Sequence, residues 1–230
     1  MAPHELGFPT PAEETDPRLD RTRIVQAALE LLDEQGFDAF SMRKLAGALD
    51  VKSPSLYWHV RSKDELFELL IDTVIGRCPL AADDGLDWMD RLVAIGLELR
   101  QVLLAHPSAV RLLPGRIPFG PNGLQLADHV IGVLRRAGFD DRLSGYGYLL
   151  LMFYVVGFAG QEVAFGKGAA DQARLTQVNE FLRGLPADRY PDLVAVADDL
   201  TGPGLTHRFE LGLVGICKEL AVQGGRTESP

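Results

Sequence analysis

The chain has few cysteines and little unbroken apolar sequence. Its 230 residues include two cysteines, Cys78 and Cys217, which lie far apart. Such a pair provides neither a disulfide framework nor the spacing of a zinc site, and it suits a reducing cytoplasm. The longest apolar run, residues 148–160, is too short to span a bilayer and predicts a deeply buried helix. We therefore expect a cytoplasmic protein with no metal, no cofactor and no membrane partner.

Positive charge is also scarce, and where it lies matters more than its total. The formal net charge is −9. Residues 1–17 are acidic and rich in proline and lack an apolar stretch, which argues against a signal peptide and predicts a disordered tail. In contrast, residues 41–63 contain five Lys or Arg residues and one acid. Phosphate contacts need local positive charge only, so the sequence favours a confined nucleic-acid site.

The region around this basic segment has the pattern of a helix-turn-helix. Apolar residues recur on one face between residues 21 and 35, with Asp20 as the expected N-cap and Gly36 as the stop. Two short helices, 42–49 and 54–60, follow with a tight turn between them. The sequence from Ser62 to Glu65 is a capping box that opens a fourth helix, which ends near residue 75. We expect a DNA-binding domain over residues 18–65, with the helix-turn-helix at 41–60.

The remainder is also predicted to be helical. We expect helices near 86–105, 108–113, 122–137, 141–165, 191–200 and 205–222, and 171–184 as a further candidate, separated by Pro and Gly. No alternating strand pattern persists. The predicted fold is all-α, with a second helical domain over residues 66–230 that binds ligand and forms a dimer.

The third helix has the side chains that DNA binding requires. With Leu56 and Val60 turned to the core, the exposed side and ends of this helix have Ser53, Pro54, Ser55, Tyr57, Trp58, His59 and Lys63. Small residues at its start allow close approach to the major groove, and the polar groups suit phosphate oxygens. Arg43 can donate two hydrogen bonds to guanine. The alternative is that Tyr57 and Trp58 are packing residues of an ordinary bundle, although adjacent aromatics cannot both face one core.

Residues 19–70 resemble the DNA-binding domain of the TetR family, and the match is clearest in LYWHV, residues 56–60. Later landmarks are similar as well: His106-Pro107, Gly138-Phe139 and the segment 209–220. The resemblance implies a homodimeric repressor that binds a palindromic operator and is released by a ligand. It also implies roles for the basic segment. Arg43 would read bases, the positions of Ser53, Pro54, Ser55 and Tyr57 would belong to the recognition helix, and Trp58, His59 and Lys63 would contact phosphates. Met42 and Ser53 depart from the family's tetracycline-binding members, so the operator should differ.

The expected sensing site departs further from those members. Leu113 stands at the position of their magnesium-binding histidine, and Pro79, Ile95 and Leu99 stand at drug-contacting positions. These side chains cannot coordinate a metal or replace the lost hydrogen bonds. We therefore expect a more apolar effector than magnesium-tetracycline. The candidate pocket residues are Ile95, Leu99, Leu113 and Ile117, with Arg116 and His129 as polar contacts; the alternative is that they are ordinary core residues.

The resemblance places the dimer interface on the helices near 141–165 and 205–222. These helices contain glycines that would permit close helix approach: Gly145, Gly157, Gly160, Gly212 and Gly215. Alternatively, the glycines accommodate neighbours within the chain or a ligand. Enzyme activity is not expected, because no histidine pair has ligand spacing and no phosphate-binding loop occurs. Two other functions stay open, a helical partner-binding module and an activator in place of a repressor.

Overall fold

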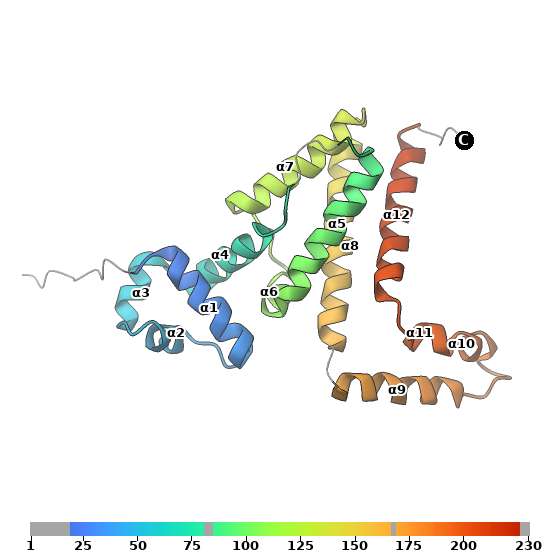
Figure 1. Ribbon diagram of the computed structural model, residues 1–230, viewed down its shortest axis with the longest axis horizontal. Helices are drawn as coiled ribbons and strands as arrows, with labels where there is room; N and C mark the ends of the chain where they lie inside the picture. The colour runs from blue at the N-terminus through green and yellow to red at the C-terminus, as the bar shows by residue number, and fades with distance from the viewer. Residues whose placement is uncertain (1–18, 81–84, 167–168, 226–230) are drawn as a thin grey trace, which may run out of the picture. The chain divides into compact units, whose positions relative to one another are not determined.

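The computed structural model describes residues 19–80, 85–166 and 169–225, and this part of the chain is helical without a strand (Figure 1). The all-α prediction is confirmed, whereas the predicted tail 1–17 lies outside the described residues. The helices are α1 Arg21–Gln35, α2 Met42–Ala48, α3 Ser53–His59, α4 Lys63–Ile75, α5 Trp88–Ala105, α6 Pro107–Leu112, α7 Pro121–Arg136, α8 Asp141–Phe165, α9 Ala169–Arg183, α10 Pro191–Ala195, α11 Ala197–Thr201 and α12 Leu205–Gln223.

The chain divides into two compact units, Met1–Leu70 and Ile71–Pro230. The division falls inside α4, beyond the boundary at residue 65 that the sequence suggested. Helix α4 is therefore shared: its first turns belong to the N-terminal unit and its last turn to the C-terminal unit.

Side-chain caps and one left-handed residue shape the N-terminal unit. The Asp20 carboxylate accepts from the amide of Arg23 at 2.7 Å and opens α1, and the Ser41 hydroxyl accepts from the amide of Lys44 at 3.2 Å and opens α2. Asp50, with φ of 55°, makes the turn between α2 and α3, a conformation that Asp tolerates better than most residues. Leu56 and Val60 are fully buried, as predicted. The helix expected over 54–60 begins one residue earlier, at Ser53, so Ser53 is not its N-cap; Lys52 holds that position without a side-chain hydrogen bond.

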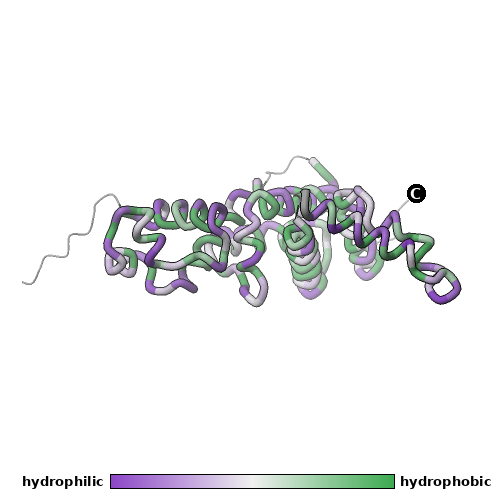
Figure 2. Tube along the Cα trace, turned by 90° about the horizontal axis from the view of Figure 1, so that it is seen from below, coloured by the Kyte–Doolittle hydropathy of each residue, from purple (hydrophilic) through white to green (hydrophobic). Residues whose placement is uncertain are grey.

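In the C-terminal unit α8 is the central helix, since it packs against α5, α6, α7 and α12. Helices α9, α10 and α11 form a separate group, in which α9 lies crosswise to α8 and α12 in Figure 1. The helix expected at 191–200 is interrupted at Val196, giving α10 and α11. Hydrophobic and hydrophilic residues alternate along the helices in Figure 2, as they do when a helix buries only one face.

The prediction that residues 148–160 form a deeply buried helix is wrong. Leu151 and Val155 are buried, but Leu149, Leu150 and Phe153 are exposed, Phe153 at 72%. Helix α8 has apolar residues on all sides, and α5, α6, α7 and α12 cover only part of it. By length and composition α8 could also cross a membrane, a test that the core helices of soluble proteins pass as well.

A buried ion pair joins α5 to α8. The Arg100 guanidinium donates from Nε and Nη2 to the two Glu162 oxygens at 2.6 and 2.7 Å, and both side chains are almost fully buried. Arg100 also lies over the rings of Phe158 and Phe209, at 5.9 and 5.0 Å from their centroids. Because a buried charge requires a partner, this pair fixes how α5, α8 and α12 meet.

Candidate functional sites

Helix α3 presents one face that is polar and aromatic. Tyr57 and Trp58 are 48% and 61% exposed, so neither ring is a core residue. Pro54 is exposed, and Ser53, Ser55 and His59 are half-buried on the same helix. Arg43 is exposed on α2. This arrangement leaves the predicted DNA-contacting side chains accessible, while Leu56 and Val60 anchor the helix from behind.

Lys63 has contacts within the N-terminal unit that the sequence did not indicate. Its ammonium Nζ donates to the carbonyl of Phe40 at 3.4 Å. It also lies 5.2 to 5.5 Å from the ring centroids of Phe37, Phe40 and Phe67. Cation–π contacts of this kind hold the charge near the start of α4. The Lys63 side chain is therefore already held in place before it would contact a phosphate.

A second set of contacts fixes the end of α3. The sequence predicted a capping box of Ser62 and Glu65 but not the contacts of Arg21. The Ser62 hydroxyl accepts from the amide of Glu65 at 3.0 Å, which is one half of the predicted capping box. The Glu65 carboxylate accepts from the amide of Arg61 at 2.6 Å and not from that of Ser62, so the other half is displaced by one residue. Arg21, from the start of α1, donates to the carbonyl of His59 at 2.9 Å and pairs with Glu65 at 3.4 Å. No local signal in the sequence links Arg21 to this helix end, because the contact joins residues 38 positions apart.

The C-terminal unit contains a cavity of about 620 Å³ between the segment 110–118 and the outer face of α8. Its wall is mainly apolar, with Leu113, Ile117 and Met152 among the lining residues. The polar groups are Arg116, Tyr148 and Gln161. Burial raises the pKa of the Tyr148 phenol, so the hydroxyl stays protonated and can donate or accept a hydrogen bond. The cavity suits a largely apolar molecule with a few polar atoms.

The six predicted ligand residues are divided among three places. Leu113, Arg116 and Ile117 line the cavity. Ile95 and Leu99 do not, because α5 turns both into the packed core, where they are 5% and 1% exposed. His129 lies on another face, in a shallow depression along α7. The residues that line the cavity come from the segment 110–118 and from α8, and not from α5. Alignment with the tetracycline-binding members could not show this, and Tyr148 and Gln161 of α8 were not predicted.

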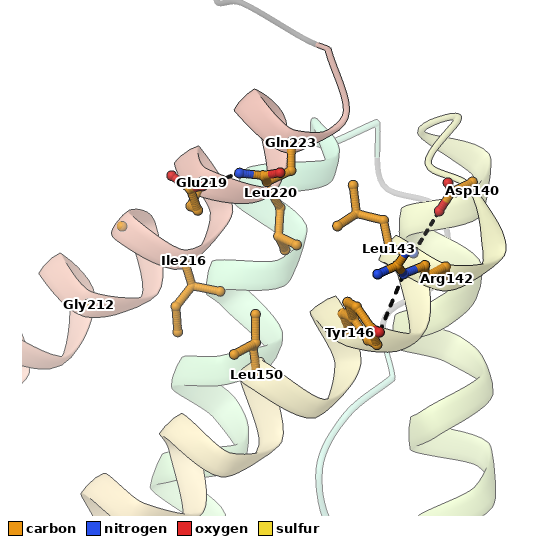
Figure 3. Close-up of a pocket in the computed structure, with 11 residues that line it drawn as sticks. Asp140, Arg142, Leu143, Tyr146, Leu150, Gly212, Ile216, Glu219, Leu220 and Gln223 are labelled. Carbon is orange, nitrogen blue, oxygen red and sulfur yellow. Dashed lines mark hydrogen bonds between the residues drawn. The ribbon is translucent and has the colours of Figure 1, made fainter.

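A groove runs between the start of α8 and the end of α12 (Figure 3). Leu143 and Leu150 of α8 and Ile216 and Leu220 of α12 form its apolar walls, and Arg142 lies at its rim with its side chain on the Tyr146 hydroxyl at 3.4 Å. Leu150, which lines this groove, is also one of the exposed apolar residues of α8.

The glycines of α8 and α12 have different surroundings. A Cβ on Gly212 would overlap the Tyr154 ring, whose hydroxyl donates to the carbonyl of Phe209 at 3.0 Å. Gly212 therefore accommodates a neighbour within the chain. The other predicted interface glycines have no atom within 4 Å of such a Cβ, so their side of the helix is open; they are Gly145, Gly157, Gly160 and Gly215.

Possible metal-binding and thiol groups were compared over the residues that the structure describes. Over residues 19–80, 85–166 and 169–225, no group of three or more His, Cys, Asp or Glu side chains is placed to hold a metal ion. Burial raises the pKa of both Cys78 and Cys217 to about 11, which keeps these thiols protonated and unreactive at neutral pH.

Comparison with known proteins explains why these surfaces occur together. The profile described as "Bacterial regulatory proteins, tetR family" matches residues 24–70, and the one described as "Tetracyclin repressor-like, C-terminal domain" matches residues 79–222. The chain belongs to the TetR family of transcriptional regulators. Members of this family bind DNA and small-molecule ligands and act as dimers. For a TetR-family protein, α1 to α3 are the helix-turn-helix domain, and α5 to α12 are the ligand-binding domain.

Individual relatives agree over most of the chain. An HTH-type transcriptional regulator of Saccharopolyspora erythraea is 37% identical over 193 residues, which cover 84% of this chain and 81% of the relative. The class A tetracycline repressor of Escherichia coli is 30% identical, with 89% and 91% covered. The structure of Streptomyces coelicolor ActR in complex with actinorhodin aligns with a TM-score of 0.83 at 35% identity, over 90% of this chain and 99% of ActR.

Proposed function

We propose that this chain is a repressor that binds a palindromic operator as a homodimer. A small, largely apolar effector other than magnesium-tetracycline would release it. The observation that carries the proposal is the exposed polar and aromatic face of α3, in a chain of this family whose C-terminal unit contains a mainly apolar cavity. The proposed domains are a DNA-binding domain at 18–65 and a ligand-binding and dimerisation domain at 66–230. Since its partner is DNA, the protein would act in the cytoplasm.

Operator binding is assigned to the two helices of the motif. Arg43 would read a base, and Lys63 would contact a phosphate. The other proposed contacts come from α3 and are Ser53, Pro54, Ser55, Tyr57, Trp58 and His59. Two hydroxyls and a proline at the start of α3 leave room for the backbone to approach base edges, while the aromatic and imidazole groups lie toward the other end.

The test is selection of binding sites from a random duplex library with the purified protein at two salt concentrations. We expect an enriched palindrome whose affinity falls steeply with salt, because several phosphates are neutralised. No enrichment at either concentration would reject operator binding and favour a helical partner-binding module. If the operator is found, reporter transcription in the presence and absence of the protein separates repression from activation.

The homodimer is proposed to form through α8 and α12. The exposed apolar side chains of α8 and its open glycines are a surface that a second copy would cover. Replacing Gly157 by leucine puts a bulky side chain on that surface and should shift the protein toward monomer in light scattering. Gly47→Leu, at a helical glycine of α2 that also has open space, is the matched control and should leave the dimer unchanged. A Gly157→Leu protein that stays dimeric would place the interface elsewhere.

The effector is proposed to occupy the cavity between segment 110–118 and α8. Two relatives support a small-molecule occupant: the ActR structure contains actinorhodin, and the class A relative is named as a tetracycline repressor. Leu113 and Ile117 offer apolar contact, and Arg116 offers a guanidinium for an acceptor on the ligand. Because leucine stands where the tetracycline-binding members have a metal ligand, magnesium-tetracycline should not release the operator.

Ile117 lines the cavity from the segment 110–118, outside the α8 and α12 surface proposed for the dimer, which allows a test by filling the cavity. A compound panel would be scored for release of the operator complex. Ile117→Trp should abolish release by the compounds that act on the wild type, whereas Ile117→Val should leave it intact. Equal release from both variants would mean that the effector binds at another site.

A further inference from the structure

The end of α3 is held by a side chain from another helix. Helix α3 has seven residues, about two turns, and Lys52 at its N-cap makes no side-chain hydrogen bond. At the other end, the amide of Val60 donates to the carbonyl of Leu56 at 2.9 Å. A helix this short is not stable by itself, and the carbonyls of its last turn have no partner within the helix. Contacts from outside α3 must therefore hold its end in place.

Arg21 supplies such contacts from the start of α1. Its Nε donates to the carbonyl of His59, the last residue of α3, at 2.9 Å, and its Nη2 lies 3.4 Å from Glu65 Oε1. The other Glu65 oxygen accepts from the amide of Arg61 at 2.6 Å. The guanidinium thus joins the end of α3 to the first turn of α4. A cation is also favourable there because the C-terminal end of a helix is the negative end of its dipole.

The backbone that carries Arg21 is itself fixed. Arg21 is the first residue of α1, and the Asp20 carboxylate caps this helix by accepting from the amide of Arg23 at 2.7 Å. On either side of Arg21, Leu19 and Ile24 are buried, at 5% and 0% exposed. The Arg21 side chain therefore reaches the end of α3 from an anchored position.

The last turn of α3 contains half of the operator contacts proposed for this helix, namely Tyr57, Trp58 and His59. The rings of Tyr57 and Trp58 are 48% and 61% exposed, so packing holds them only in part. Their positions depend on the backbone of the turn, which the buried Leu56 anchors on one side and the Arg21 contact holds at its end. Without that contact, any displacement of the turn would move all three side chains together.

We propose that Arg21 is a positioning residue for operator binding, which holds the last turn of α3 in the orientation that DNA requires. This inference rests on the proposed function and adds a residue of α1, outside the two helices of the motif. Arg21 acts through the His59 carbonyl and through Glu65. Because its side chain is 59% exposed, a direct contact with a phosphate is the competing role, and the two roles differ in their salt dependence.

The first measurement is amide hydrogen exchange at Val60 in the free, full-length protein, because this amide closes the last turn of α3. Arg21→Ala should speed its exchange by about fivefold, as expected for the loss of one hydrogen bond that stabilises the turn. Gln26→Ala is the matched control, since Gln26 makes an exposed side-chain contact with Glu30 on the same helix, at 2.8 Å. It should leave the rate unchanged. An unchanged rate in Arg21→Ala would overturn the proposal.

The second measurement is the affinity for the operator duplex selected from the library, over a range of salt concentrations. Arg21→Ala should lower this affinity by about fivefold or more, because DNA binding must then order the turn. The slope of affinity against salt should stay as in the wild type, whereas loss of a phosphate contact would flatten it by about one. Gln26→Ala should change neither the affinity nor the slope.

Arg21→Lys separates the two roles further. Lysine keeps the positive charge but offers a single nitrogen in place of the planar fork that contacts both His59 and Glu65. For a positioning residue, Arg21→Lys should also lose affinity. Wild-type affinity in Arg21→Lys, or a flattened salt slope in Arg21→Ala, would assign Arg21 to a phosphate contact and overturn the proposal.

These outcomes distinguish the inference from the proposed function. If no operator is selected, the proposed function fails, and the Val60 exchange rate alone decides whether Arg21 holds the end of α3. If the wild type selects an operator and Arg21→Ala binds it with unchanged affinity, the positioning role is wrong while the repressor proposal stands.

Discussion

Removing the carboxylate of Glu162 is expected to destabilise the C-terminal unit by about 3–5 kcal/mol, the range for breaking a buried ion pair from one side. In Glu162→Leu the Arg100 guanidinium loses both of its short hydrogen bonds. What it keeps is the Thr206 hydroxyl at 3.4 Å and the rings of Phe158 and Phe209. These contacts cannot neutralise a charge whose side chain is 8% exposed.

Thermal unfolding followed by circular dichroism measures this effect. For a chain of this size, 1 kcal/mol shifts Tm by about 2–4 °C, so Glu162→Leu should lower Tm by roughly 6–20 °C. The double variant Arg100→Met with Glu162→Leu removes both charges and should recover most of the loss. Arg183→Ala breaks an ion pair in which both partners are about two-thirds exposed, and it should cost less than about 1 kcal/mol.

Two results would refute the reasoning. A Glu162→Leu protein with a Tm within about 2 °C of the wild type would mean that water or another group compensates Arg100, and that the site is not closed. A double variant as unstable as the single variant would mean that packing around these side chains, and not the uncompensated charge, determines the loss.

Four further substitutions and modifications have defined outcomes. Arg43→Ala should weaken operator binding by about 1–3 kcal/mol and relax the preference at one base pair per half-site, and an unchanged selected sequence would exclude base reading. Lys63→Ala should weaken all duplexes alike and flatten the salt slope by about one, so a sequence-selective loss would contradict it. Because burial raises the pKa of Cys78 and Cys217 to about 11, neither should react with a thiol reagent near neutral pH until the protein unfolds; rapid labelling of the native state would contradict this. Burial and neighbouring arginines lower the pKa of His129, so the unfolded chain binds the proton first and stability should fall as pH drops below about 6.5, until the folded-state pKa is passed. A glutamine at this position should reduce that dependence in thermal melts, and an equally steep dependence would assign it to other groups.

The helices themselves could be predicted because their signals are local. Asp20, Ser41 and Gly36 mark helix ends through hydrogen bonds or backbone conformations that involve residues three or four positions away. The helix over 141–165 was predicted with the bounds that the structure shows, since Asp140 caps its start and Gly166 ends it. The break at Val196 was missed because no proline or glycine marks it.

It was harder to predict which helix faces are buried, because a helix that is apolar on all sides does not indicate which side is covered. For α8 the hydrophobic pattern has no preferred face, and only the packing of α5, α7 and α12 shows that Leu151 is buried while Phe153 is exposed. In α5, Ile95 and Leu99 were expected in the pocket because they stand at drug-contacting positions of the tetracycline-binding members, but both lie in the core.

Local sequence signals predict the all-α class, the positions of most helices, the family, and the residues of α3 that turn away from the core. These follow from periodicity, caps and a short motif, which depend on neighbours along the chain. Folding creates the pairing of Arg100 with Glu162, the walls of the cavity, and the hydrogen bonds between Asp72 and the start of α7. Arg100 and Glu162 are 62 positions apart, Asp72 and Gly123 are 51 apart, and the cavity walls come from the separate segments 110–118 and 148–161, so only the folded chain brings these groups together.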